Sequence, residues 1–424
     1  MLQLLPCLPT SSRRKLAAGM IGMAGWLACQ VAAAAAADRI VLKLGGHFDA
    51  AAVSVNQGHG RGLRSESIVS SGEVYVQGKL SLDNGWDIGA RFEFEVERDN
   101  GLSGTGPDLQ YRDDLIDEAW VYIEGAFGRV ELGQQDGVAD QIMYFAPTVS
   151  KSIRVNNPDI YMLECAPSVS CSSSPTGRPY APNGIQLRTD MHVSEDYSKV
   201  VYYTPRFYGF QAGISYTPEL TRNFSGFGTR QSGQANQQSK IWELGLNFGE
   251  TFAGVDVGLS AAWLKGSNEA PATIFAPGFA PDDVEEFGFG AKVGYREFTL
   301  GGSYRKTNVQ GGIGILNDAT LSPFTYNVYR DHDTVIWEAG IKYQKGPWSL
   351  GANYVKADAE TPNFTTSQKA EAFEVAAGHV IGPGIEVAAG YQHYDFKGPQ
   401  NRCDGVECDT TDAGVFFLET TISF

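Results

Sequence analysis

Hydrophobic and polar residues alternate with a period of two along most of the chain from Arg39 to Phe424. The clearest stretch is 86–98, in which the apolar residues share one face: Trp86, Ile88, Ala90, Phe92, Phe94 and Val96. Its other face takes Asp87, Gly89, Arg91, Glu93, Glu95 and Glu97. Successive side chains of a β-strand point to opposite sides, so this pattern predicts strands with one apolar and one wet face. It recurs at 73–83, 255–263, 286–296, 337–344 and 416–424.

Short and long connections alternate between these stretches. Tight turns are predicted near residues 83–85, 127–128, 207–209, 249–250, 295–297, 345–347 and 382–384, where Gly, Pro, Asn or Asp interrupts the pattern in most cases. Longer polar segments lie around 56–66, 99–113, 138–196, 219–238, 267–283, 308–332, 358–369 and 397–411. Fifteen connections predict sixteen strands, with both chain ends on the side of the short turns.

Strands with one wholly apolar face suit a wall between lipid and water. In lipid every backbone N–H and C=O must be paired, so a sheet there has to close on itself. Aromatic residues near strand ends are typical of the two membrane interfaces: Trp86, Tyr295, Trp348, Tyr354, Tyr391 and Phe424. The predicted fold is therefore an all-β transmembrane antiparallel β-barrel. A secreted β-sandwich or propeller, whose apolar faces would meet in one core, is the alternative.

The first 37 residues have the features of a secretory signal. A positive stretch at 13–15 precedes an apolar stretch at 16–31, and alanines at 32–37 suit signal peptidase. Residues 1–37 are therefore predicted to be a cleaved signal peptide, with 38–424 forming the barrel. A transmembrane anchor is the alternative for this segment. After Ala37 no stretch of about 18 apolar residues exists, so no membrane-spanning helix is expected there.

Charge argues against nucleic acid as a partner. The predicted signal holds three of the 33 Lys and Arg residues and none of the 49 Asp and Glu residues, so 38–424 carries a formal charge of −19. Such a surplus of acids repels phosphates and attracts cations. We therefore expect a lumen and outer surface that favour cations mildly.

Four cysteines outside the predicted signal form two close couples, Cys165 with Cys171 and Cys403 with Cys408. In an oxidising compartment adjacent cysteines favour two local loop disulfides, although four cysteines allow three pairings. Zinc binding is the competing interpretation, but the couples lack the C-x-x-C spacing and a nearby cluster of histidines.

Particular segments of the chain resemble the Gram-negative general porins, closest to the alphaproteobacterial type. The resemblance rests on the start Arg39-Ile-Val-Leu-Lys-Leu-Gly-Gly-His-Phe48, on Gly128-Arg-Val-Glu-Leu-Gly-Gln-Gln-Asp-Gly137 in the fifth strand, on the long segment after it, and on the terminal Phe424 with alternating residues before it. Family members often have Arg where Gln134 stands, so no constriction charge is carried over to that position.

The resemblance implies a trimeric channel in the Gram-negative outer membrane for passive diffusion of small hydrophilic solutes and ions. It implies short periplasmic turns, long extracellular loops, and one loop folded into the pore, here within the 138–196 constriction-loop region. That segment is long for such a loop, so part of it is expected outside the pore. The resemblance also implies that the barrel-assembly machinery recognises the C-terminal strand.

A pore selects by its width and by the charges on its wall. Charged residues at inward positions of the pattern, or on the predicted constriction loop, are the candidates for the pore lining: Lys43, Lys79, Arg91, Lys292, Arg305, Lys342, Glu93, Glu95, Glu131, Glu243, Glu386, Asp136, Asp140, Asp159 and Glu164. We expect Asp140 and Asp159 to oppose Lys43, Lys79 and Arg91, which would place a transverse field at the narrowest point. Each single residue could instead line a wide vestibule.

Other functions leave weaker signals. The sequence has no G-x-S-x-G, H-E-x-x-H or P-loop motif, so no enzyme and no cofactor are expected. The alternative channel function is a substrate-specific track for sugar, phosphate or small acids, with aromatic steps drawn from Tyr75, Trp120, Tyr122 and Tyr394. A barrel serving as an adhesin or anchor is a third hypothesis. Loop acids could bind Ca²⁺, although solvated surface charge also explains them: Asp282, Asp283, Asp404, Glu407 and Asp409.

Overall fold

Strands account for most of the chain that the computed structural model describes, namely residues 40–57, 65–95, 116–156, 163, 187–220, 238–268, 283–308, 333–360, 367–397 and 411–424. In chain order the strands are β1 (Val41–Gln57), β2 (Glu66–Ser81), β3 (Asp87–Glu95), β4 (Ala119–Gly125), β5 (Gly128–Gln134), β6 (Ser198–Tyr203), β7 (Phe210–Glu219), β8 (Gln238–Phe252), β9 (Val255–Asn268), β10 (Glu285–Tyr295), β11 (Phe298–Thr307), β12 (Thr334–Lys345), β13 (Trp348–Ala359), β14 (Gln368–Gly382), β15 (Ile385–Lys397) and β16 (Thr411–Ser423). A short helix, α2 (Val138–Gln141), follows β5. No helix among the described residues is long and apolar enough to cross a membrane.

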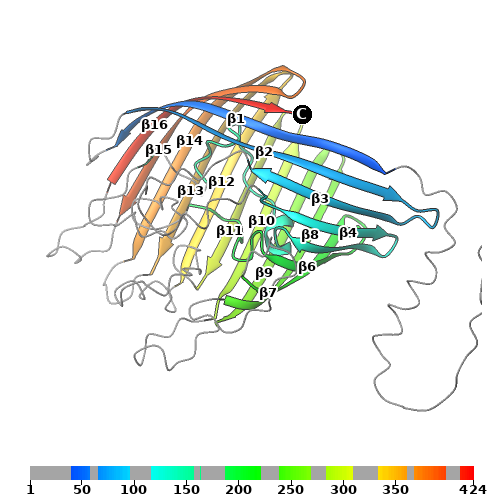
Figure 1. Cartoon of the computed structure of the whole chain (residues 1–424). Helices are drawn as coiled ribbons and strands as arrows, with labels where there is room; N and C mark the ends of the chain where they lie inside the picture. Colours follow the sequence, from blue (N-terminus) through cyan, green and yellow to red (C-terminus); the bar gives the residue numbers. More distant parts are fainter. Residues whose placement is uncertain are drawn as a thin grey trace, which may run out of the picture.

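The sheet closes on itself. Each strand pairs antiparallel with its neighbours in the chain, and β1 also pairs with β16 (Figure 1). At the closing seam Gly46 and Phe424 exchange two backbone hydrogen bonds, each 3.0 Å long. A closed sheet has no row of unpaired edge groups, which is the condition for spanning lipid. The prediction of a closed, sixteen-stranded antiparallel barrel is confirmed.

One predicted turn is wrong. Gly249 and Glu250 lie within β8, and the chain reverses at Ala253 and Gly254, whose φ angles are +49° and +83°. Gly249 serves close packing instead, because a Cβ there would lie 2.8 Å from the Tyr144 hydroxyl. The other six predicted turns coincide with short connections between strands, and all eight predicted long segments coincide with connections on the opposite side, called the loop side below.

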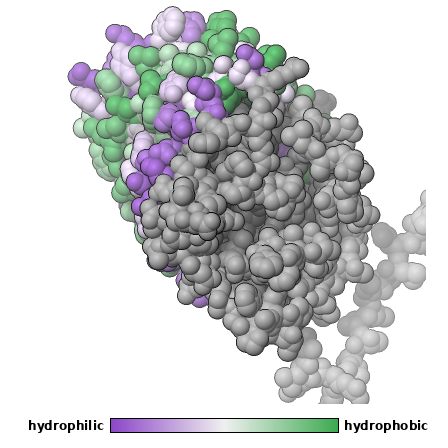
Figure 2. Space-filling model, turned by 90° about the vertical axis from the view of Figure 1, so that its left-hand side faces the viewer, coloured by the Kyte–Doolittle hydropathy of each residue, from purple (hydrophilic) through white to green (hydrophobic). Residues whose placement is uncertain are grey.

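The apolar faces of the strands point outward. On β3, Phe92 is 44% exposed, whereas the neighbouring Glu93 is 6% exposed and points into the barrel. The described part of the outer wall carries many hydrophobic residues, seen as green areas in Figure 2. Exposed hydrophobics outside and buried charges inside are the reverse of a soluble protein. The predicted orientation of the two faces is confirmed, and a sandwich with one apolar core is excluded.

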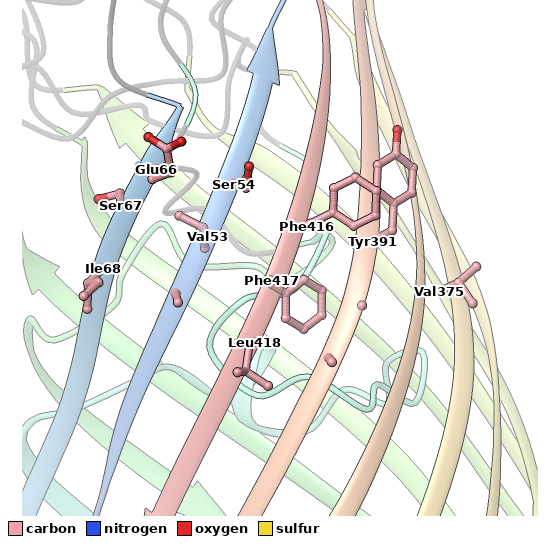
Figure 3. Close-up of a pocket in the computed structure, with 13 residues that line it drawn as sticks. Val53, Ser54, Glu66, Ser67, Ile68, Val375, Tyr391, Phe416, Phe417 and Leu418 are labelled. Atoms are coloured by element: carbon pink, nitrogen blue, oxygen red, sulfur yellow. The ribbon is translucent and has the colours of Figure 1, made fainter.

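A shallow apolar depression on the outer wall shows this lipid-type surface in detail (Figure 3). It crosses β1, β2, β14, β15 and β16, and the rings of Tyr391 and Phe416 lie side by side with centroids 4.7 Å apart. Ile68 and Leu418 are more than half exposed there. The small side chains of Ala52 and Ala389 belong to the same depression.

The inner wall departs from the expected polar surface over β12–β16 and β1. Toward the loop side the inward residues of these strands are apolar and buried, and they include Ala51, Val53, Val355, Ala357, Ala359, Ala370, Ala372, Tyr394, Phe396, Ala413 and Val415. Apolar residues of the segment between β5 and β6 cover them, among them Val149, Ile153 and Val155. This apolar part of the inner wall is therefore buried against protein and does not face water.

A charge on the outward face should weaken the barrel. Leu246 lies near the middle of β8 and is 46% exposed. Replacing it by Arg is expected to lower the free energy of unfolding by about 2–4 kcal/mol, because the charge would sit in hydrocarbon. Unfolding by urea in lipid vesicles measures this. Lys292→Gln, on the inward face of β10, is the control and should change the value by less than about 0.5 kcal/mol; equal effects of both substitutions would contradict the assigned faces.

Candidate functional site

The segment between β5 and β6, residues 135–197 and called L3 below, lies along the inner wall in its described parts. Backbone N–H groups of L3 donate to carboxylates that point inward from the strands. Ala139 donates to Glu243 of β8 (2.8 Å), and Ala146 donates to Glu338 of β12 (2.8 Å). Glu419 of β16 receives three such bonds, from Lys151, Ser152 and Ile153 at 2.8, 2.7 and 3.1 Å. These buried carboxylates satisfy loop N–H groups that no strand pairs.

Neutral polar side chains hold L3 between these carboxylates. Ser215 of β7 accepts from the N–H of Val138 (3.2 Å), and Ser260 of β9 accepts from the N–H of Tyr144 (2.8 Å). On β13 and β15, Asn353 and Gln392 donate to the carbonyl oxygens of Pro147 and Ile153 in L3. On β14 and β1, Glu374 and Asp49 accept from the hydroxyls of Ser150 and Ser152 in L3. L3 therefore crosses the inner wall from β7 to β1.

Glycines on eight successive strands make room for this crossing, and together they are called the glycine trough: Gly213, Gly245, Gly258, Gly290, Gly301, Gly340, Gly351 and Gly378. A Cβ on Gly290 would lie 2.0 Å from the carbonyl oxygen of Tyr144, and one on Gly351 would lie 2.7 Å from a Val149 methyl. At these two positions no larger residue fits without displacing L3. Gly288 of β10 likewise packs against Met191, because a Cβ there would lie 2.7 Å from the Met191 sulfur.

The returning part of L3, residues 187–197, is held by a buried network of charges. Arg188 pairs with Asp190, which it contacts at 2.7 Å through Nε, and also with Glu195 at 3.3 Å. Burial alone would raise the pKa of Asp190, but the Arg188 guanidinium holds it well below its usual range. On the wall, Arg305 of β11 pairs with Glu286 of β10 at 2.5 Å, and both are fully buried.

His192 lies between two guanidinium groups of this network. Its Nδ1 is 3.3 Å from an Arg305 nitrogen. Burial, followed by the charges of Arg188 and Arg305, lowers the pKa of His192 well below its usual value, so the ring stays neutral. Thr189 adds a 2.6 Å hydroxyl contact to Ser303 of β11. The return part is thus fixed to β10 and β11.

The two ends of L3 meet at the Lys199 ammonium. It donates to the carbonyl oxygens of Gln135 at one end and of Ser194 (2.8 Å) and Glu195 at the other. The place where the two ends of L3 meet is called the neck of L3 below. Asp136 lies in this neck, where burial and the nearby Asp196 raise its pKa to about 7. Carboxylate oxygens of Glu118, Asp136 and Asp196 lie within 4.8 Å of one another, a spacing that a hard divalent cation could bridge.

Opposite the trough, the wall of β2–β5 carries two repeats of one arrangement. The Tyr75 ring lies where a side chain on Gly45 would be, and the Arg91 guanidinium stacks 4.0 Å from the ring centroid. Arg91 also pairs through Nε with Glu93, two residues along the same strand. This set is called unit 1, and its members come from β1, β2 and β3.

Unit 2 repeats the same geometry two strands further on. The Tyr122 ring occupies the space beside Gly89, and Arg129 stacks 4.1 Å from its centroid. Arg129 pairs through Nε with Glu131 and through Nη1 with Glu124 (3.2 Å). Each tyrosine is thus covered by a guanidinium on one face and by a glycine on the other.

Comparison with known proteins agrees with this geometry. A model of the family described as Gram-negative porin matches residues 23–399. The chain belongs to the Gram-negative porin family. Its fold and family are those of outer-membrane channel proteins rather than of enzymes.

Individual relatives are distant in sequence. An uncharacterized protein of Rickettsia felis is 20% identical over 351 residues, covering 72% of this chain and 75% of that protein. The anion-selective porin from Comamonas acidovorans has a similar structure, with 16% identity, a TM-score of 0.56, and coverage of 91% of this chain and all of that one. OmpF of Salmonella typhi gives 14% identity, a TM-score of 0.56 and the same coverage. At these identities the solved structures support the fold alone.

The porin places its predicted lumen residues in different surroundings. Arg91, Glu93 and Glu131 belong to the two units, whereas Lys79 pairs with Asp87 at 2.6 Å and Lys43 lies exposed near the turn side. Glu95 lies across from Glu73. Glu243 and Arg305 are buried against L3, and Lys342 donates to the carbonyl oxygen of Thr148 in L3. Lys292 is exposed on the inner face of the barrel, and Glu386 lies 3.6 Å from Lys151.

Of the two loop acids predicted to face the basic residues of the early strands, the structure describes Asp140 but not Asp159. Asp136 and Asp140 lie at the start of L3, where burial and then Asp136 raise the pKa of Asp140. No contact joins Asp140 to Lys43, Lys79 or Arg91 among the described residues. Asp159, Glu164, the predicted signal 1–37 and the couples Cys165–Cys171 and Cys403–Cys408 lie outside the described residues, as do the expected Ca²⁺ ligands apart from Asp283.

Sequence reasoning missed several residues that build this site. Arg129 lies two residues before Glu131, so the alternation that selected Glu131 also places Arg129 inward. Glu338 lies at a polar position of the 337–344 alternation, but a period of two does not show that it accepts from a loop N–H. Gln134, the position that departs from the family, is buried with 5% exposure. The glycine trough has a sequence trace only in the abundance of 50 glycines.

Removing the acceptor for three N–H groups should loosen L3. Glu419→Leu leaves the N–H groups of Lys151, Ser152 and Ile153 without their acceptor, and each unsatisfied buried donor costs about 1–3 kcal/mol. We expect the free energy of unfolding to fall by roughly 3 kcal/mol. Glu386→Leu on the adjacent strand is the control, because Glu386 is 43% exposed and contacts L3 only through a 3.6 Å ion pair. Equal small effects would show that Glu419 does not anchor L3.

The neck of L3 should respond to pH through Asp136. An unfolded Asp ionises near 3.8, whereas folded Asp136 keeps its proton up to about 7. The unfolded state therefore loses its proton first as pH rises between these values, and the stability of the fold decreases over this interval. Asp136→Asn should flatten that part of the stability–pH curve, measured by unfolding in detergent, while Asp358→Asn at the exposed rim should keep the wild-type slope. A wild-type slope in Asp136→Asn would refute this.

Proposed function

We propose that the protein forms a water-filled channel for passive diffusion of small hydrophilic solutes and ions, with a mild preference for cations. One observation supports the preference above all. Residues 38–424 carry 30 Lys and Arg residues against 49 Asp and Glu residues, a formal charge of −19. Charges inside a barrel are only partly screened over about 10 Å at physiological salt, so this surplus favours cations in the lumen.

L3 is proposed to set the width of this channel. It occupies the lumen side of β7–β16 and β1, which leaves the wall of β2–β5 as the polar side of the passage. The charged residues proposed for the narrowest part are Lys43, Lys79, Arg91, Glu93, Glu95, Glu131, Asp136, Asp140 and Asp159. Because the described parts of L3 are bonded at so many strands, we propose that they form a fixed side of the constriction.

The proposed setting is the outer membrane, with lipid against the outward apolar faces. A homotrimer is proposed because a similar structure, OmpT of Vibrio cholerae at 15% identity and a TM-score of 0.53, is described in a trimer form. Phe424 follows directly after the last strand β16, and we propose that the assembly machinery binds there before β16 joins β1.

A substrate-specific track for sugars is the second candidate, and the aromatic residues weigh against it. Tyr75 and Tyr122 are each covered by an arginine on one side and a glycine on the other, so neither offers a free ring face. Tyr394 is fully buried in the apolar inner wall. Trp120, the fourth candidate, is half-buried with the Arg129 guanidinium 5.2 Å from its ring centroid. Stacking of sugar rings, which needs open aromatic faces, therefore has no support at three of the four positions.

Conductance of the purified protein in planar bilayers tests the proposal. We expect stepwise openings and, in a potassium chloride gradient, a reversal potential of the sign for cation preference. Glu95→Gln removes an inward acid of β3 and should reduce that potential. Glu66→Gln, on the adjacent strand β2 but at the outer depression, is the control and should not. Absence of steps would refute the channel, and an anion-selective sign would refute the preference.

A further inference from the structure

We infer that units 1 and 2 form a binding strip for zwitterionic solutes of the amino acid class, an inference that rests on the proposed channel function. Each unit offers a guanidinium and a carboxylate side by side on the lumen wall. The two arginine side chains are 25% and 28% exposed, so solutes in the lumen can reach them.

The arginines are held rigidly with free donors. In unit 1, the Arg91 plane is fixed by the Tyr75 ring and by its Nε bond to Glu93, and the described residues give its two terminal nitrogens no hydrogen-bond partner. In unit 2, the described residues likewise give Nη2 of Arg129 no partner. A preorganised guanidinium with unpaired N–H groups binds a carboxylate well, because little side-chain entropy is lost.

The adjacent carboxylates decide which ligand charge fits. A simple anion at either guanidinium would also meet Glu93 or Glu131, and a simple cation at these acids would meet the arginine. The two carboxylate side chains are 8% exposed, so they act on a solute through their charge, which attracts an ammonium group held beside the arginine. A molecule carrying both charges close together complements both partners at once.

The spacing of the units extends the inference to short peptides. Their tyrosines belong to β2 and β4, two strands apart, which corresponds to about 10 Å at the usual spacing of strands in a sheet. An extended peptide covers this distance with about three residues. Between the units lies the Gln77 amide, which donates to the Tyr122 hydroxyl (3.0 Å) and adds a polar group to the strip.

Uptake into proteoliposomes with four solutes of one skeleton tests this inference. Alanine is zwitterionic, lactate anionic, alaninamide cationic and lactamide neutral, and all are of nearly equal size. We expect alanine to enter several-fold faster than lactamide and to saturate with concentration. Equal, non-saturating entry of alanine and lactamide would overturn the binding strip, while a protein that passes none of the four would overturn the channel itself.

Paired substitutions connect the effect to the two units. Arg91→Gln with Glu93→Gln, and Arg129→Gln with Glu131→Gln, each remove one positive and one negative charge, so the formal charge of the lumen stays the same. Each pair should reduce the ratio of alanine to lactamide entry, and both together should abolish it. Lys306→Gln with Asp333→Asn removes an outward ion pair (2.5 Å) at the loop-side rim and should leave the ratio unchanged. A wild-type ratio in the fourfold variant would refute the assignment.

Discussion

The pairing of β1 with β16 is the constraint on which the rest of the structure depends. It removes the two sheet edges that would otherwise expose unpaired backbone groups. Only after closure do the strands have an inside and an outside, and only then can apolar residues face outward without forming a common core. The lumen that closure creates would be too wide to discriminate by itself, so the way it is filled determines function.

The described parts of L3 lie along the inner wall through two complementary features of that wall. The glycine trough removes side chains where the segment passes, and inward carboxylates receive its N–H groups. Several inward acids therefore lie under L3, where its N–H groups stabilise them. The opposite wall, β2–β5, keeps charged residues in self-contained ion pairs stacked on tyrosines. One side of the lumen is therefore the charged wall of β2–β5, and the other side is covered by the described parts of L3.

Much of the fold could be predicted from the sequence because its physics is local. Alternation fixed the faces of β3 and β10, and turn residues located the strand ends except where Gly249 proved to be a packing glycine. The site was less accessible, since it depends on contacts between distant segments. Glu419 and Ile153 are 266 residues apart, and the apolar inner wall at Val355 and Ala357 has the pattern of a lipid-facing one. A period of two cannot tell which apolar face a loop will cover.

Site-directed spin labels on β10 test the central claim most directly, because Phe289 and Lys292 lie on opposite faces of one strand. Each is replaced by a labelled cysteine in the protein reconstituted in vesicles. The structure predicts that the label at 289 collides mainly with oxygen dissolved in lipid, and that the label at 292 collides mainly with a water-soluble nickel chelate. A label at 292 shielded from the chelate, or one at 289 open to it, would contradict a barrel with lipid outside and water within.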